Sequence, residues 1–570
     1  MTFLHDEPKT FAADALKGFS LAYWRFVRHA PGGVLRATPT PEGKVAVVIG
    51  GGSGHYPAFA GYVGPGLADA AVAGDIFASP STRSVARISR LAHRGGGVLL
   101  GFGNYAGDVL NFGAAARRLS AEGIDARILP VTDDVASAPA DSAKLRRGVA
   151  GDIFVFKVAG AAAEAGKNID EVERLARLAN ARTVSFGVAF AGCTLPGAKE
   201  PLFVVPPGQM GIGLGIHGEP GIAEEPIVSA SALAQILVDK LVRERPKDSS
   251  GRVAVMLNGL GGTKYEELFA LWLSVEAALV ARGLAIVAPE VGEFVTSLDM
   301  AGCSLTISWL DHGLEELWLA PALSAAFRRG PEVHARSLEP IEETQAEAPK
   351  VPAATPDSKA SARCIAAVMA SLATAMQQAE EELGRIDARA GDGDHGQAMS
   401  RGAKAANEAA NRAVASGAGA ATVLGLAADA WGDRAGGASG ALWGVGLRAW
   451  SEAFSDSAAI APAAVAKGAA AARDAIVGLG GAKVGDKTLI DALDPFVRTL
   501  EQEIAKGRSL PDAWRAAANA ASEAALGTAP LTPKLGRARP LAARSVGFPD
   551  AGAISLALCA QAVGGELGNA

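Results

Sequence analysis

Cysteine is scarce in this sequence. Only four cysteines occur among 570 residues, and no two of them form a Cys-x-x-Cys pair. This spacing supports neither a zinc site nor a disulfide framework, so we expect reduced thiols. The four are Cys193, Cys303, Cys364 and Cys559.

Long apolar runs and clusters of basic residues are also missing. No segment approaches the length of a membrane-spanning helix, about 18 consecutive apolar residues. Residues 1–8 lack the basic start and apolar core of a signal peptide. The net charge of −6 comes without any group of Lys and Arg that could hold nucleic acid. We therefore expect a cytoplasmic protein with neither a membrane nor a nucleic acid as partner.

A phosphate-binding loop of the Walker type is absent as well. Its nearest approach, at residues 160–168, has one residue too many and lacks the required Ser or Thr. Any nucleotide must therefore be bound by another kind of loop.

The chain is long enough for two or three domains, and its composition changes along its length. Short β-rich runs alternate with alanine-rich amphipathic stretches as far as residue 335, which indicates an α/β domain. Residues 336–360 are rich in proline and acid and predict a linker, which could span roughly 75 Å at about 3.1 Å per residue. Helix formers dominate residues 361–570, which predicts an all-α domain. The expected strands cover residues 45–49, 97–100, 126–131, 183–190 and 252–257.

A glycine loop ending in histidine follows the first of these strands. Residues 50–55 read GGGSGH, a pattern that offers backbone N–H donors and an imidazole to a small polar molecule. A tight strand-to-helix turn with a capping histidine is the plain alternative, and the spacing does not fit a dinucleotide fingerprint. A second histidine loop at residues 213–220 favours one pocket shared by His55 and His217.

Three aspartates mark the second half of the chain. Asp387, Asp392 and Asp394 stand in a glycine-containing segment, where divalent cations would relieve their mutual repulsion. A solvated turn is the alternative, and an EF-hand is excluded because Gly396 stands where a ligand should be. The pattern therefore favours a Mg2+ site.

A second glycine loop, GGASG at residues 436–440, precedes a helical run expected from Ala441. Free N–H groups at a helix start, together with the hydroxyl of Ser439, suit a phosphate, although such a loop can also be a plain linker.

These motifs, in this order, resemble the dihydroxyacetone kinases in their single-chain, ATP-dependent form. Residues 50–80, the NYAGD stretch at 104–108 and the GIHGEP loop at 215–220 are similar to that family's ketose-binding domain. Residues 387–396, 485–493 and 550–553 are similar to its nucleotide domain. The resemblance covers nearly the whole chain. It implies a K-type α/β ketose-binding domain at residues 1–335 and an L-type ATP-binding barrel of antiparallel helices at residues 361–570.

The resemblance also implies roles for individual residues. His217 would bond covalently to the ketose carbonyl as a hemiaminal, Asp108 would act as general base, and His55 would hydrogen-bond the substrate. Gly52 and Ser53 would add loop contacts. The three aspartates would hold Mg2+ ions on the ATP phosphates. The nucleotide would lie against His395, Gly396, Gly437, Ser439, Gly481, Thr488, Arg537, Asp550 and Gly552.

Two departures from the family pattern concern the substrate. Tyr56 and Phe59 stand where the glycine loop typically continues His-Glu-Pro-Ala-His, and Gly103 replaces a lysine before the Asn-Tyr pair. These changes resemble the branch that phosphorylates erythrulose, with dihydroxyacetone as the alternative. The family resemblance leaves other activities open: a non-catalytic ketose-sensing regulator, a component recharged by a phosphocarrier protein, and a nucleotide cyclase. By analogy we expect a homodimer, with domain swapping allowed by the linker.

Overall fold

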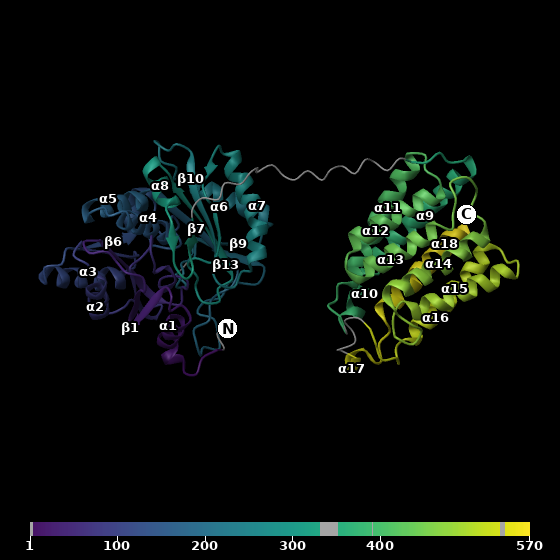
Figure 1. Cartoon of the computed structure of the whole chain (residues 1–570), viewed down its shortest axis with the longest axis horizontal. Helices are drawn as coiled ribbons and strands as arrows, with labels where there is room; N and C mark the ends of the chain where they lie inside the picture. Colours follow the sequence, from purple (N-terminus) through teal and green to yellow (C-terminus); the bar gives the residue numbers. More distant parts are fainter. Residues whose placement is uncertain (1–3, 220, 331–350, 390, 536–541, 570) are drawn as a thin grey trace. The chain divides into compact units, whose positions relative to one another are not determined.

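The computed structural model describes residues 4–219, 221–330, 351–389, 391–535 and 542–569. The chain divides into two compact units, Met1–Leu338 and Glu339–Ala570 (Figure 1). The first contains strands and helices, and the described part of the second is helical throughout. The α/β and all-α classes expected from the sequence are confirmed.

The described part of the first unit contains two large sheets and a small one, in which β14 (Ala322–Leu323) pairs with β15 (Arg328–Arg329). The first large sheet carries the glycine loop. Strands β3 to β6 of this sheet are parallel, whereas β1 and β2 form an antiparallel edge. Helices α2 (Thr82–Ala92) and α3 (Ala106–Ala121) pack on one face of the sheet, while α4 (Asp152–Glu164) and α5 (Ile169–Ala181) contact it through a separate core. The strand order is β1 (Val27–Ala30), β2 (Gly33–Arg36), β4 (Ala70–Ile76), β3 (Ala46–Ser53), β5 (Val98–Gly103), β6 (Ala126–Val131).

The glycine run belongs largely to β3 rather than to a loop. This strand continues to Ser53, and the chain turns only at Gly54, where φ is +102°. A Cβ at Gly50 would lie 2.5 Å from the carbonyl oxygen of Val72 on β4, and one at Gly51 would lie 2.6 Å from the Phe59 ring. The glycines therefore let β3 pack closely against its neighbours.

The second sheet is mostly antiparallel and has α6 (Ala230–Val242) and α7 (Tyr265–Ala281) on one face. Side chains of β10 alternate, so that Val253 and Val255 face these helices while Ala254 and Met256 face the core shared with the first sheet. The strand order is β11 (Ala285–Ile286), β10 (Arg252–Gly259), β13 (Gly302–Trp309), β7 (Thr183–Ala189), β8 (Gln209–Ile212), β9 (Ala223–Pro226), with β12 (Glu290–Gly292) also beside β10.

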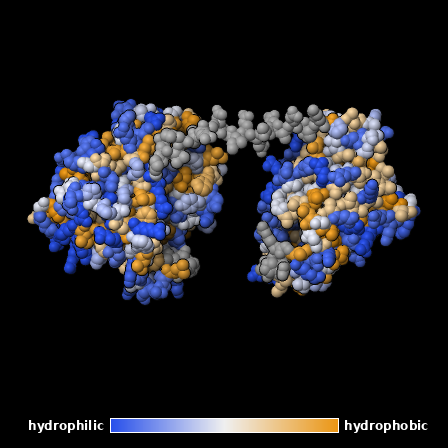
Figure 2. All heavy atoms as spheres, viewed as in Figure 1, coloured by the Kyte–Doolittle hydropathy of each residue, from blue (hydrophilic) through white to orange (hydrophobic). Residues whose placement is uncertain are grey.

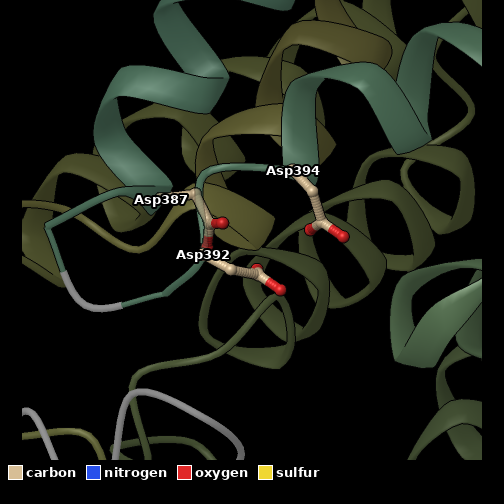
Figure 3. A group of neighbouring side chains, drawn as sticks. All are labelled: Asp387, Asp392 and Asp394. Carbon is tan, nitrogen blue, oxygen red and sulfur yellow. The ribbon is translucent and has the colours of Figure 1, made fainter. Parts of the chain in front are cut away.

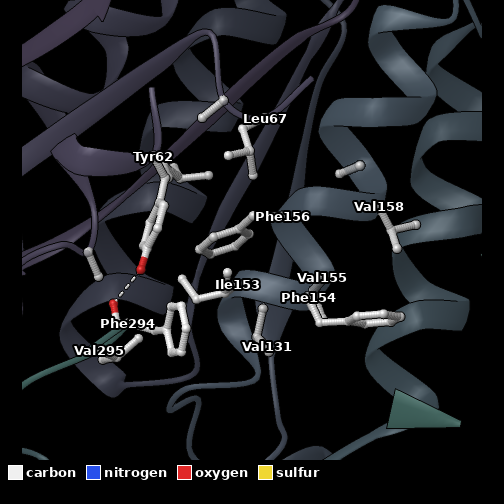
Figure 4. Packing of buried hydrophobic residues seen from close by; sticks show 14 of the residues in the cluster. Tyr62, Leu67, Val131, Ile153, Phe154, Val155, Phe156, Val158, Phe294 and Val295 are labelled. Carbon is white, nitrogen blue, oxygen red and sulfur yellow. Dashed lines mark hydrogen bonds between the residues drawn. The ribbon is translucent and has the colours of Figure 1, made fainter. Parts of the chain in front are cut away.

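The core of the first unit is built around α4. This helix is buried along almost its whole length, which explains why its sequence is apolar on every side. Phe156 projects from it toward Tyr62, whereas Phe154 points away from Tyr62 and packs against Trp318 (Figure 4). The Tyr62 hydroxyl donates a hydrogen bond of 2.7 Å to the carbonyl oxygen of Phe294. This bond ties the segment after the glycine loop to the segment that follows β12.

The long helices of the second unit pack in a closed ring, each against the next and the last against the first. The ring confirms the expected helical barrel. It encloses an apolar cavity of about 310 Å³ lined by Trp443, Trp450 and Trp514 among others. The order is α9 (Pro356–Gln378), α11 (His395–Ala415), α12 (Ala420–Ala435), α13 (Gly437–Ser451), α14 (Pro462–Gly480), α15 (Ile490–Ala505), α16 (Leu510–Gly527), α18 (Ala551–Asn569); the short α10 (Glu380–Asp387) and α17 (Ala542–Ser545) are additional.

Two helices begin earlier than the sequence predicted. Helix α9 starts at Pro356, inside the range assigned to the linker, because the Thr355 side chain accepts a hydrogen bond from Ser358 N and Pro356 suits the first turn. Helix α13 starts at Gly437 rather than Ala441, because the positive φ of Gly436 sharply separates it from α12.

Hydrophilic residues cover much of the face seen in Figure 2, with hydrophobic residues scattered among them on each unit. Within the part of the chain that the structure describes, one helical segment, Ala551–Gly568, is long and apolar enough to cross a membrane by length and composition. Its buried residues belong to the core of the helical ring, where α18 packs between α9 and α16, so its apolar character is that of a core helix.

Candidate active site and metal centre

The histidines of the two glycine loops meet in the first unit. His55 Nε2 lies 3.0 Å from His217 Nε2, although 162 residues separate them in sequence. His55 Nδ1 lies 2.7 Å from the carbonyl oxygen of Thr296. Because a carbonyl can only accept, Nδ1 carries the hydrogen, and burial lowers the pKa of His55 to about 3. The neutral ring therefore presents an acceptor at Nε2, and the hydrogen shared with His217 belongs to His217.

Glu219 holds the other side of the His217 ring. Its Oε1 lies 3.0 Å from His217 Nδ1, and its Oε2 accepts the backbone N–H of His217 at 2.9 Å. Burial alone would raise the pKa of Glu219, but hydrogen bonds and charge attraction from His217 outweigh it and lower the pKa to about 2. Both ring nitrogens of His217 thus act as donors, one toward a carboxylate and one toward His55.

Aromatic rings fix the two histidines in place. Phe77 stacks on His55 with ring centroids 5.0 Å apart and meets His217 edge-on at 5.2 Å. Tyr105 meets His217 edge-on at 4.6 Å. These contacts leave the His217 ring little freedom to turn away from its two polar partners.

Asp108 lies in the first turn of α3 and is 8% exposed. Burial raises its pKa to about 6, against the opposing effects of Ser79 and of the His217 charge. Its Oδ1 has no hydrogen-bond partner among the described residues. A buried carboxylate with a free oxygen and a pKa near neutrality can accept a proton from a bound hydroxyl.

The other two residues predicted for this site come from β3. The Ser53 hydroxyl donates to the carbonyl oxygen of Gly74 at 2.7 Å, so its hydrogen is used within the fold. Gly52 lies so close to Ala78 that a Cβ would approach Ala78 N to 2.8 Å. Both residues line a cavity of about 580 Å³, together with Tyr56 and Phe59.

The three aspartates come together between α10 and α11, with ligand oxygens that all lie within 4.8 Å of one another (Figure 3). Asp387 ends α10, and its Oδ2 accepts the N–H of Gly393 at 2.9 Å, which fixes the turn. Asp392 and Asp394 are exposed. Hard carboxylate oxygens at this spacing fit a Mg2+ ion. Such an ion keeps several bound waters and can bind phosphate oxygens as well.

Several residues predicted to contact the nucleotide surround this trio. His395 begins α11. Its Nδ1 lies 3.2 Å from Ser439 Oγ, and its Nε2 lies 2.9 Å from Ser555 Oγ. Burial lowers the pKa of His395. Gly396 packs against the carbonyl of Glu380, which a Cβ would approach to 1.9 Å. The start of α11 is therefore fixed beside the start of α13.

Asp550, directly before α18, lies close enough to the aspartate trio to interact electrostatically with Asp387. Burial, together with the charges of Asp491 and Asp387, raises the pKa of Asp550 to about 7, against the opposing effects of Ala553 N–H and Lys487. Gly552 lies against Leu489, next to Thr488, whose N–H donates to Asp491 at 2.7 Å. Of the remaining predicted residues, Gly437 lies in the first turn of α13 and Gly481 caps α14 with φ +69°. Arg537 lies outside the described residues.

Sequence reasoning missed several residues that orient the histidines. Glu219 stands two positions after His217 in the same motif, and that proximity was an available signal. Phe77 and Tyr105 also lie within the motif segments. The Thr296 carbonyl had no signal, because backbone groups leave no trace in the sequence.

Comparison with known proteins agrees with this architecture. Residues 17–326 match the Dak1 domain and residues 389–564 match the DAK2 domain. The chain is 54% identical to a D-erythrulose kinase of Mycolicibacterium smegmatis, over 99% of this chain and 98% of that protein. It is 53% identical to an L-erythrulose kinase of Pectobacterium atrosepticum, over 100% and 97%. The crystal structure of the dihydroxyacetone kinase from C. freundii in complex with AMP-PNP and Mg2+ superposes with a TM-score of 0.62, at 30% identity and 99% coverage of both chains.

The α/β unit contains the paired histidines, and the helical ring contains the three aspartates. This combination is that of a two-domain kinase. The chain belongs to the dihydroxyacetone kinase family in its single-chain form.

Proposed function

We propose that this protein transfers the terminal phosphoryl group of ATP to the terminal hydroxyl of a short-chain ketose, with erythrulose preferred. One observation carries the chemical part of the proposal: His217 is held between Glu219 and His55 in the same unit as the buried carboxylate of Asp108. The choice of erythrulose is supported by the two erythrulose kinases that share more than half of their residues with this chain.

Capture of the ketone would use His217 Nε2. His217 Nε2 would first pass the hydrogen it shares to His55 Nε2, which frees the lone pair of His217 Nε2. This lone pair bonds to the carbonyl carbon as the C=O double bond opens, and the carbonyl oxygen takes the hydrogen from His55. The product is a hemiaminal with a hydroxyl group, and its alkylated imidazolium keeps Glu219 as counter-ion. Covalent attachment orients the terminal hydroxyl and rejects polyols, which have no carbonyl.

Transfer would use Asp108 as the base that removes the proton from the terminal hydroxyl. Asp387, Asp392 and Asp394 would hold Mg2+, which neutralises charge on the ATP phosphates when bound. His395 and Ser439 would line the phosphate end of the nucleotide, and Asp550 and Gly552 another side.

We assign ketose binding to residues 1–335 and nucleotide binding to residues 361–570. A cytoplasmic homodimer, with domain swapping through the linker, stays a prediction of the family resemblance.

The test compares phosphorylation of D-erythrulose, L-erythrulose and dihydroxyacetone by the full chain with ATP and Mg2+, followed by mass spectrometry. We expect faster turnover of one erythrulose enantiomer, and none with His217→Ala. A preference for dihydroxyacetone would support the alternative that the C. freundii relative suggests. Product formed only after a phosphocarrier protein is added would overturn the assignment to ATP. Ketose binding without turnover would indicate a regulator.

A further inference from the structure

A buried ion pair lies directly behind Glu219. Arg147 Nη2 contacts Asp134 Oδ2 at 2.7 Å, and Arg147 Nη1 lies 3.9 Å from Glu219 Oε2. Asp134 is 4% exposed, and the Arg147 side chain is 15% exposed. Charges therefore alternate in a row from Asp134 through Arg147 and Glu219 to His217, and the row ends at the neutral ring of His55.

The backbone leaves room for this row at one glycine. A Cβ on Gly215 would lie 2.0 Å from Glu219 Oε2 and 2.5 Å from Arg147 Nη1. No side chain larger than hydrogen fits there without separating the two groups. Arg147 is also anchored to the histidine loop itself, because its Nη2 donates to the carbonyl oxygen of Gly213 at 3.3 Å.

We propose that Arg147 is a positioning residue for ketone capture: it fixes the Glu219 carboxylate, which in turn aims the His217 ring at the substrate. This inference rests on the proposed function and adds a residue that does not itself touch the ketose. The cation keeps apart two carboxylates, Asp134 and Glu219, whose charges otherwise repel each other.

Removal of that cation should change the protonation of Asp134, of Glu219 or of both, because Arg147 lowers the pKa of Asp134. With Arg147→Gln, Asp134 and Glu219 face each other across a buried space, and the pKa of at least one of them rises. His217 then loses its fixed counter-ion as the pH falls. Among the described residues, the other ionisable groups near this row carry no positive charge that could replace the guanidinium; they are His55, Tyr105, Asp108, Asp133, Asp152 and Cys193.

The chain offers matched variants. Arg147→Lys keeps the charge but loses the planar fork, and Gly215→Ala keeps every charge but separates Glu219 from Arg147. Arg146→Gln is the control, because Arg146 is even more buried than Arg147 and pairs with Glu244 at 3.0 Å but makes no side-chain contact with the histidines. Circular dichroism and thermal unfolding identify any variant that fails to fold.

The first measurement is made on the ligand-free full chain labelled with ¹⁵N-histidine. We expect Arg147→Gln and Gly215→Ala to shift the His217 ring signals and to move their pH titration, while Arg146→Gln leaves both unchanged. Unaltered His217 signals and titration in both folded variants would overturn the positioning role, whatever the reaction of the enzyme.

The second measurement adds [2-¹³C]erythrulose without nucleotide. We expect a tetrahedral C2 signal in the wild type, a roughly tenfold weaker apparent affinity with Arg147→Gln, and partial rescue with Arg147→Lys. As the pH is lowered, the affinity for erythrulose should begin to fall at a higher pH in Arg147→Gln than in the wild type. Absence of the tetrahedral signal in the wild type would overturn covalent capture, and the positioning role would then be decided by the histidine signals alone.

Discussion

His55 Nε2 and His217 Nε2 lie 3.0 Å apart and share one hydrogen. No carbon atom fits between two nitrogens at this distance, so a ketone that bonds to His217 must displace the contact. His55 is buried and tied to Thr296, whereas His217 is half-buried, so we expect a small shift of His217 that opens this contact but keeps its hydrogen bond to Glu219.

Substitution of His55 by alanine separates capture from turnover. His217 and Glu219 remain in place, so the tetrahedral C2 signal of bound [2-¹³C]erythrulose should persist, although it should form more slowly. Turnover should fall roughly 100-fold, because a proton-transfer partner is lost. Complete loss of the C2 signal, as expected for His217→Ala, would contradict this division of roles.

The pH dependence of turnover should follow Asp108. As a base the carboxylate must be ionised, so kcat should rise as the pH increases through about 6. Asp108→Asn should lower kcat at least roughly 100-fold and remove this limb. If kcat of Asp108→Asn still rises with pH through about 6, the titrating group is not Asp108.

The ionised carboxylate of Asp108 should destabilise the folded state, because it is buried. Its pKa in the folded chain, about 6, lies above the ordinary value of 3.8, so the folded state binds its proton more tightly than the unfolded state. Stability from this group is therefore fully present below pH 3.8 and is lost as the pH rises to about 6. Urea unfolding should show Asp108→Asn to be more stable than wild type by roughly 3 kcal/mol above that range. The difference should vanish near pH 4 and below.

Asp392→Asn should weaken Mg2+ binding and lower kcat by roughly two orders of magnitude, because a charged oxygen ligand becomes neutral. Isothermal titration with MgATP gives the affinity, and chelation of the metal should stop wild-type turnover. Asp474→Asn is the matched control, since Asp474 is exposed and pairs only with Arg473 among the contacts of the described residues. Equal effects of both substitutions would contradict the metal assignment.

The sequence predicted strands best where apolar residues run together. The range expected for residues 126–131 coincides with β6, and the start of β7 at Thr183 is also correct. Strand β13 was missed because every second residue is polar, as in Ser304, Thr306 and Ser308. These side chains are nevertheless buried, and two of them pair with β7: Thr306 Oγ1 lies 2.6 Å from Ser185 Oγ, and Ser308 Oγ lies 2.9 Å from Thr183 Oγ1. Such cross-strand pairs become visible only once the register is known.

The site also contains residues that the sequence predicted and residues that it did not. Residues within the histidine and aspartate motifs were predictable because a family pattern names them. The positions of Arg147 and the Thr296 carbonyl follow from how distant segments pack, and local sequence carries no signal for that.

Lys487 should be essential to the stability of the helical unit. Its Nζ is buried and donates to three carbonyl oxygens, those of Ala529, Leu531 and Ser545. Lys487→Met keeps a side chain of similar length but leaves these acceptors unsatisfied, and we expect a loss of roughly 3 kcal/mol or more in urea unfolding. Lys506→Met should change stability by less than about 0.5 kcal/mol, because Lys506 is exposed and its partner Glu503 keeps a second ion pair with Arg508. Similar effects of the two substitutions would show that the carbonyls find other donors.

Gly103 should help to set the choice of ketose. It ends β5, and a Cβ there would lie 3.1 Å from Cε2 of Tyr105 and 3.2 Å from the carbonyl oxygen of Gly148. Because the Tyr105 ring packs edge-on against His217, a side chain at position 103 that displaces this ring reaches the capture site. Gly103→Lys should therefore lower kcat/KM for erythrulose about tenfold relative to dihydroxyacetone, since the larger substrate loses space first.

Gly18→Lys is the control for Gly103→Lys, because position 18 lies in α1 (Phe11–Ala22) with open space around its Cα. This control should leave the ratio of kcat/KM values for the two ketoses unchanged. If folded Gly103→Lys also keeps the wild-type ratio, the space over Gly103 does not select the substrate. Tyr56 and Phe59, which also depart from the family pattern, would then be the next residues to exchange. Both side chains line the cavity of about 580 Å³ that Gly52 and Ser53 also line.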